Sequence, residues 1–215
     1  AAPVITSLTR GAASITNGTS TTLVPVFSNG TGSINNGVGS VTSGSTYTVS
    51  PSSTTTYTLT VTNAANSTAT SSTTVTVVPA PVATSLTLGT STITAGTSTT
   101  LTPVFSNGTG SINTVGAVTS GLSRDVYPES TITYTLTVTN AIGATASTNT
   151  TVTVVPAPVA TSLTAGSTSI LRGNSTTLTP VFSNGTGVIT PGDISVTSGS
   201  TYTVSPSSTT TYTLT

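Results

Sequence analysis

The chain has 215 residues, of which only 3% are charged, and three arginines balance three acidic residues to a net charge of zero. Nucleic acids, anionic membrane surfaces and charged substrates are therefore not expected as partners, because each requires a charged patch. The chain lacks cysteine and histidine, which excludes a disulfide framework and the usual zinc ligands.

Threonine and serine make up more than two fifths of the chain, so its solubility must rest on hydroxyl groups. Hydrophobic residues still account for 33%, and they are regularly spaced, which argues against a disordered segment or a mucin-like stalk. No apolar run approaches the roughly 20 residues that a membrane-spanning helix needs. We expect a folded segment without a membrane span.

The predicted elements are all β-strands. Residues 21–27 (TTLVPVF), 54–62 (TTTYTLTVT) and 72–78 (STTVTVV) alternate apolar and hydroxyl side chains, the period-two pattern of half-buried strands. Gly, Asn-Gly and Ser-Gly turns separate such strands at roughly the 8–12-residue spacing typical of a β-sandwich. About seven strands are expected in each complete copy of the repeat described next.

The sequence repeats itself three times. PVFSNGTG occurs at 25–32, 103–110 and 180–187, and APVITSLT at 2–9 returns as APVATSLT at 80–87 and 157–164. The sequence therefore predicts three modules, which are residues 1–79, 80–156 and 157–215.

Short proline-rich links join the modules. Each link reads Pro-Ala-Pro, which is stiff because proline restricts both its own backbone and that of the preceding residue. The expected arrangement is an extended rod. The third module, 157–215, lacks a counterpart of the last strand, strand G. We expect the chain to continue, with a strand donated by a neighbouring subunit as the alternative.

The string TYTLTVTN resembles strand F of immunoglobulin-like domains. The resemblance implies a tyrosine corner at Tyr57, Tyr134 and Tyr212, in which the hydroxyl bonds back to main chain. Leucine stands two residues later, where antibody domains have a cysteine. The chain is thus similar to the disulfide-free immunoglobulin-like repeats of bacterial adhesins and other cell-surface proteins. The implied fold is all-β, a tandem array of antiparallel β-sandwiches, with Ile34 and Ile112 as core residues of strand C.

Catalysis is not expected from this inventory. General acid–base chemistry usually needs histidine, lysine or a tuned carboxylate, and the only acidic residues are Asp125, Glu129 and Asp193. Calcium sites usually need several carboxylates, so no metal or other cofactor is expected. We expect no catalytic, cofactor-binding or metal-binding residue.

Charge gathers at one place in the second module. Aligned by the repeat, STYTVSPSS at 45–53 becomes LSRDVYPES at 122–130, which introduces Arg124, Asp125 and Glu129. These three residues are a candidate contact patch for a neighbouring subunit. The alternative is a solvated strand, because exposed ion pairs contribute at most about 1 kcal/mol.

Two further features have a functional and a structural interpretation. Asn29, Asn107 and Asn184 each begin an Asn-Gly-Thr sequon and are candidate glycan acceptors, although Asn-Gly is also a strong turn signal. Outward rows of threonine resemble those of ice-binding proteins locally. Sheet twist of about 20–25° per strand pair disfavours the flat lattice that ice binding needs.

The sequence predicts a non-catalytic extracellular or cell-surface structural protein, namely a stalk, filament or surface-layer component. Neutral sandwiches lose little charge solvation on packing, so lateral or head-to-tail self-association is expected, with other cell-surface proteins as alternative partners. Two alternative functions are an adhesin module that binds a glycan or protein, and an accessory region of a larger secreted enzyme.

Overall fold

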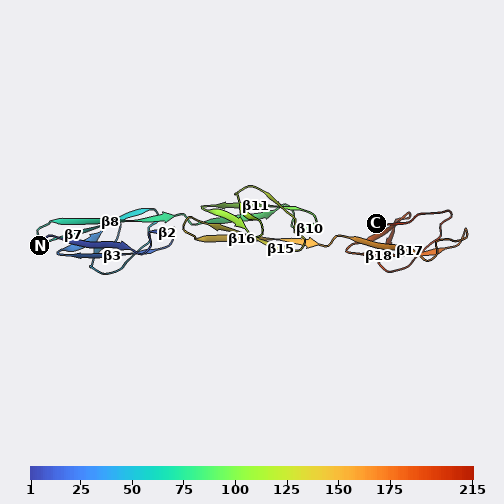
Figure 1. The fold of residues 1–215 in the computed structure, drawn as a ribbon, viewed down its shortest axis with the longest axis horizontal. Coiled ribbons are helices and arrows are strands. Elements are labelled where there is room, and N and C mark those ends of the chain that lie inside the picture. The colour runs from blue at the N-terminus through green and yellow to red at the C-terminus, as the bar shows by residue number, and fades with distance from the viewer. The chain divides into compact units, whose positions relative to one another are not determined.

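The computed structural model describes residues 1–215 and consists of β-strands and connecting turns (Figure 1). It forms six sheets, two from each of three successive stretches of the chain. The all-β fold class expected from the alternating sequence is confirmed. None of the elements is a long apolar helix of the kind that crosses a bilayer.

The first sheet pair is built from eight strands. One sheet has the order β1-β3-β6 and the other β2-β8-β7-β4-β5. The strands are β1 (Val4–Arg10), β2 (Ser14–Thr16), β3 (Thr21–Ser28), β4 (Thr31–Ile34), β5 (Gly39–Val41), β6 (Tyr47–Val49), β7 (Thr55–Thr62) and β8 (Thr68–Val78).

The count of eight exceeds the expected seven because the first strand is divided. β1 runs antiparallel to β3, whereas β2 runs parallel to β8 in the other sheet. Between them the Gly11 amide donates to the Thr22 carbonyl at 2.9 Å, and the Ala12 amide donates to Thr21 Oγ1 at 2.7 Å. The chain therefore crosses from one sheet to the other at Gly11 while its backbone groups remain hydrogen-bonded.

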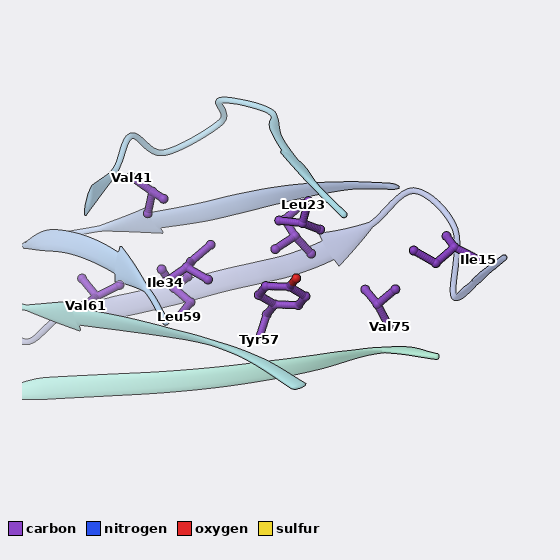
Figure 2. Close-up of a cluster of buried hydrophobic side chains, with 9 residues drawn as sticks. Ile15, Leu23, Ile34, Val41, Tyr57, Leu59, Val61 and Val75 are labelled. Atoms are coloured by element: carbon purple, nitrogen blue, oxygen red, sulfur yellow. The ribbon is translucent and has the colours of Figure 1, made fainter. Parts of the chain in front are cut away.

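The core of this pair lies between the two sheets. Figure 2 shows its side chains pointing toward one another from facing strands. Leu23 of β3, Leu59 of β7 and Val75 of β8 are fully buried, and Ile34 is 2% exposed. The alternation in the sequence thus places one side of each strand inside, and the assignment of Ile34 to the core is confirmed. Ile112, at the same place in the second copy, is 1% exposed.

The second sheet pair repeats this order, with one sheet β14-β11-β9 and the other β10-β16-β15-β12-β13. Its strands are β9 (Val82–Leu88), β10 (Thr92–Thr94), β11 (Thr99–Ser106), β12 (Thr109–Ile112), β13 (Gly116–Val118), β14 (Arg124–Val126), β15 (Ile132–Thr139) and β16 (Thr145–Val155).

The third sheet pair has the orders β17-β18-β21 and β20-β19-β22. Its strands are β17 (Val159–Ala165), β18 (Thr176–Ser183), β19 (Gly187–Thr190), β20 (Ile194–Val196), β21 (Tyr202–Val204) and β22 (Thr213–Leu214). Residues 169–171, the counterparts of β2, form no strand, and Leu171 is 78% exposed. In the first pair the same segment is a strand because β8 supplies its hydrogen-bonding partner.

Spatial proximity divides the chain into two compact units. One comprises residues 1–89, 100–126 and 133–150, and the other comprises residues 90–99, 127–132 and 151–215. This division does not follow the expected module boundaries after residues 79 and 156, which stay a prediction.

Candidate functional site

On four strands of the five-stranded sheet in the first pair, β4, β5, β7 and β8, the outward side chains are hydroxyls except for Val78 at the end of β8. Strand register places Thr60 of β7 opposite Thr70 of β8 and Ser33 of β4, and Ser33 opposite Ser40 of β5. We call this surface the hydroxyl face. Its members are Thr31, Ser33, Ser40, Thr56, Thr58, Thr60, Thr62, Thr68, Thr70, Ser72, Thr74 and Thr76.

Neighbouring hydroxyls on this face bond to one another. Thr56 Oγ1 and Thr74 Oγ1 are 2.8 Å apart, and Thr58 Oγ1 and Ser72 Oγ are 2.9 Å apart. Threonine side chains are stiff because they branch at Cβ, and each hydroxyl can both donate and accept. The face therefore offers an ordered array of donors and acceptors without charge. The cross-strand bonds occupy part of the donor capacity that a layer of ordered water would need.

The charged residues of the second copy lie on its surface. Arg124 and Asp125 are exposed on β14, an edge strand, and Glu129 is exposed in the loop that follows. Their role as a contact patch stays a prediction. Sequence reasoning missed Leu122, which is 61% exposed and replaces Ser45 of the first copy. An apolar residue in place of serine at a surface turn was the signal that could have found it.

The sequon asparagines form left-handed turns. Asn29, Asn107 and Asn184 have φ of 61°, 59° and 59°. Each side-chain amide Nδ2 donates to a main-chain carbonyl near the start of the same copy, at 3.1 Å to Ala2, 2.9 Å to Ala80 and 3.2 Å to Ala157.

Steric crowding explains why glycine follows each of the first two asparagines. A Cβ atom at Gly30 would lie 2.6 Å from the Thr62 carbonyl oxygen, and one at Gly108 would lie 2.5 Å from that of Thr139. The turn interpretation of Asn-Gly thus rests on defined contacts. The glycan-acceptor interpretation of Asn29, Asn107 and Asn184 stays a prediction.

A second pair of asparagines, Asn63 and Asn140, escaped the sequence analysis. Asn140 is 6% exposed, and its Oδ1 accepts the amides of Ile142 at 3.2 Å and Ala144 at 2.9 Å. Its Nδ2 donates to the Pro79 carbonyl at 3.0 Å. The recurring string TLTVTN contains this residue at its end and was the available signal.

The tyrosines of strand F lie in the cores. Tyr57 is 3% and Tyr134 4% exposed, and burial raises the pKa of both phenols above the ordinary value. Tyr212 is half-buried. Main-chain bonds to a tyrosine hydroxyl occur at other positions. The Thr42 amide donates to Tyr47 Oη at 2.7 Å, and Tyr202 repeats this contact. The tyrosine corner at 57, 134 and 212 stays a prediction.

No protein-family model and no curated protein matches the chain. Among solved structures it is similar to the I-band fragment I67–I69 from titin, with a TM-score of 0.55, 16% identity, and coverage of 93% of this chain and 83% of that one. An E-to-A variant of the three-domain titin fragment has a TM-score of 0.54 at 14% identity, with 92% and 82% covered. The fold is immunoglobulin-like.

Immunoglobulin domains 1–5 of Sidekick-1 also match, at 16% identity and a TM-score of 0.48. The match covers 93% of this chain and 49% of that one, so the chain spans about half the length of that protein fragment. These identities are low, and the likeness concerns the tandem immunoglobulin-like fold.

Within the immunoglobulin-like fold, Leu59 and Leu136 are fully buried on strand F. These two leucines fill the core at the positions that correspond, by the resemblance, to the strand F cysteine of antibody domains. Half of the residues that line a hollow of about 660 Å³ beside Tyr47 and Tyr57 are serine, threonine or proline. No group of three or more histidine, cysteine, aspartate or glutamate residues is placed to hold a metal ion.

Proposed function

We propose that this chain is a non-catalytic structural repeat region of an extracellular or cell-surface protein, as part of a stalk, filament or surface layer. One observation carries the proposal: the recurring motif PVFSNGTG is used for contacts inside the fold. In the first copy, Phe27 packs on Gly32, and Asn29 holds the Ala2 carbonyl. A motif kept for ligand binding would be expected to present free side chains instead.

The composition supports the same role. The three arginines leave few sites for trypsin-like cleavage, and the near absence of titratable groups makes stability insensitive to pH over the acidic and neutral range. Both properties suit a protein exposed outside the cell.

The hydroxyl face supports lateral self-association. It is self-complementary, because every hydroxyl both donates and accepts, and no charge must be desolvated when two copies meet. The contact would be stabilised both by hydrogen bonds between the molecules and by burial of the threonine γ-methyl groups. Part of this surface is already organised by bonds such as Thr56 to Thr74.

Sedimentation velocity and negative-stain microscopy over a concentration series test this function. We expect the chain to form lateral assemblies that the double variant Thr70→Lys/Ser72→Lys weakens at least tenfold, because it places two charges on the hydroxyl face. Thr48→Lys is the matched control, since it adds a charge to exposed β6 in the other sheet. A wild-type chain that stays monomeric at all concentrations would contradict the assembly.

A binding role is the second candidate, favoured by the exposure of Leu122 beside the charged strand β14. Arginine and exposed apolar residues are enriched at recognition surfaces. The triple variant Leu122→Ser/Arg124→Tyr/Asp125→Thr restores the residues of the first copy. Loss of retention on bacterial surface glycans or proteins in this variant would support an adhesin module, and unchanged retention would count against it.

A further inference from the structure

Two asparagine side chains donate hydrogen bonds to the Pro-Ala-Pro link that leads into the second sheet pair. Asn140 Nδ2 donates to the Pro79 carbonyl at 3.0 Å, and Asn107 Nδ2 donates to the next carbonyl, that of Ala80, at 2.9 Å. Asn107 lies in the turn between β11 and β12, and Asn140 in the turn between β15 and β16. Two turns far apart in sequence thus bind two successive carbonyls of the Pro-Ala-Pro link.

The first sheet pair carries the same arrangement at its own start. Asn63 Nδ2 donates to the Ala1 carbonyl at 2.9 Å, and Asn29 Nδ2 donates to that of Ala2 at 3.1 Å. Because the contacts recur at equivalent positions, we interpret them as a regular feature of the repeat and not as chance contacts. In the third copy Asn184 makes the equivalent contact with Ala157 at 3.2 Å.

In the second copy, Asn140 also contacts the sheet pair that precedes the link. Asn140 Nδ2 lies 3.4 Å from Thr16 Oγ1 of β2. Asn140 is 6% exposed, whereas its counterpart Asn63 is half-buried. All four hydrogen-bonding directions of the Asn140 amide are thereby used, two at Oδ1 and two at Nδ2.

We propose that Asn107 and Asn140 form a clamp that locks the Pro-Ala-Pro link onto the sheet pair that follows it. Proline already limits the link, since it fixes φ and biases the preceding residue toward extended geometry. Pro79 and Pro81 have no amide N–H, so Ala80 is the only residue of the link that can donate a backbone hydrogen bond, and the carbonyls are its main points of attachment. Asparagine side chains supply the donors. The clamp restricts bending at the link by making it part of the following fold.

The variant Asn140→Asp separates the clamp from the local turn. A carboxylate still accepts the amides of Ile142 and Ala144, but it cannot donate to the Pro79 carbonyl. Asn63→Asp is the matched control, because it makes the same change in a turn that holds Ala1. Asn107→Asp and its counterpart Asn29→Asp test the other arm in the same way.

The readout is the width of the distance distribution between two spin labels. The chain has no cysteine, so Ser40→Cys and Ser147→Cys, both at exposed positions, take the labels specifically. We expect Asn140→Asp to broaden the distribution at least twofold and Asn63→Asp to leave it unchanged.

Circular dichroism establishes that each variant is folded. If Asn140→Asp does not fold, the Asn107→Asp and Asn29→Asp pair decides, since Asn107 is exposed. A folded clamp variant with a distribution as narrow as that of the wild type would overturn the proposal. Equal broadening in the clamp variant and its control would overturn it as well.

Discussion

The ring of Phe27 lies so close to Gly32 that a Cβ atom on the glycine would stand 2.4 Å from Phe27 Cζ. The same relationship joins Phe105 to Gly110 at 2.4 Å. Both residues belong to PVFSNGTG, five positions apart, at the end of one strand and the start of the next. The aromatic ring thus bridges the two sheets of each pair across a glycine that has no side chain to obstruct it.

Gly32→Ala should destabilise the first sheet pair by about 1–3 kcal/mol, because a buried Cβ forces the ring or the backbone to move. Scanning calorimetry of the full chain would show one transition shifted to lower temperature. In the double variant with Phe27→Leu, the smaller side chain relieves the clash. The stability loss of the double variant should therefore be smaller than the sum of the losses of the two single variants. Strict additivity would contradict direct contact.

Leu59→Ala should cost about 2–5 kcal/mol, because it leaves a cavity at a fully buried position of β7. Hydrogen exchange in peptides from β7 and β8 would report the loss locally within the full chain. Thr58→Ala, the adjacent residue on the hydroxyl face, should cost no more than about 1 kcal/mol, because it loses only a solvent-exposed hydrogen bond to Ser72. Similar effects of the two substitutions would contradict the inward and outward assignment.

Tyr47→Phe should cost about 1 kcal/mol, because the Thr42 amide loses its acceptor at Tyr47 Oη. Tyr57→Phe should cost less at neutral pH, since it keeps the ring that fills the core. Denaturation by urea, followed through hydrogen exchange of β6 and β7, compares the two. A larger loss for Tyr57→Phe would instead support a tyrosine corner in strand F.

Stability should fall at strongly alkaline pH. Burial raises the folded-state pKa of Tyr57 and Tyr134 above the unfolded value of about 10. Below the unfolded pKa the phenols are neutral in both states and stability is unaffected. As pH rises above about 10 the unfolded chain loses protons first, and stability declines until the folded phenols also ionise. Urea midpoints at increasing pH should show this decline, and Tyr57→Phe should reduce it.

Much of the fold could be predicted from the sequence. Alternation in TTTYTLTVT identified which side of β7 is buried, because a strand's side chains point to opposite faces in turn. Repetition of PVFSNGTG indicated tandem copies. The division of the first strand at Gly11 could not be predicted, since the parallel pairing of β2 with β8 joins residues about sixty positions apart. Local periodicity carries no information on such pairings.

The candidate site divides in the same way. Sequence alone determined the composition of the hydroxyl face, because alternation with apolar residues sends Thr56, Thr58, Thr60 and Thr62 of β7 outward. It also found the left-handed turn at Asn29, which Asn-Gly favours locally. Only the tertiary structure decided that this amide holds a carbonyl 27 residues earlier, and that Asn140 holds the Pro-Ala-Pro link. Turn and strand preferences are local, whereas these hydrogen bonds form only once packing has brought distant segments together.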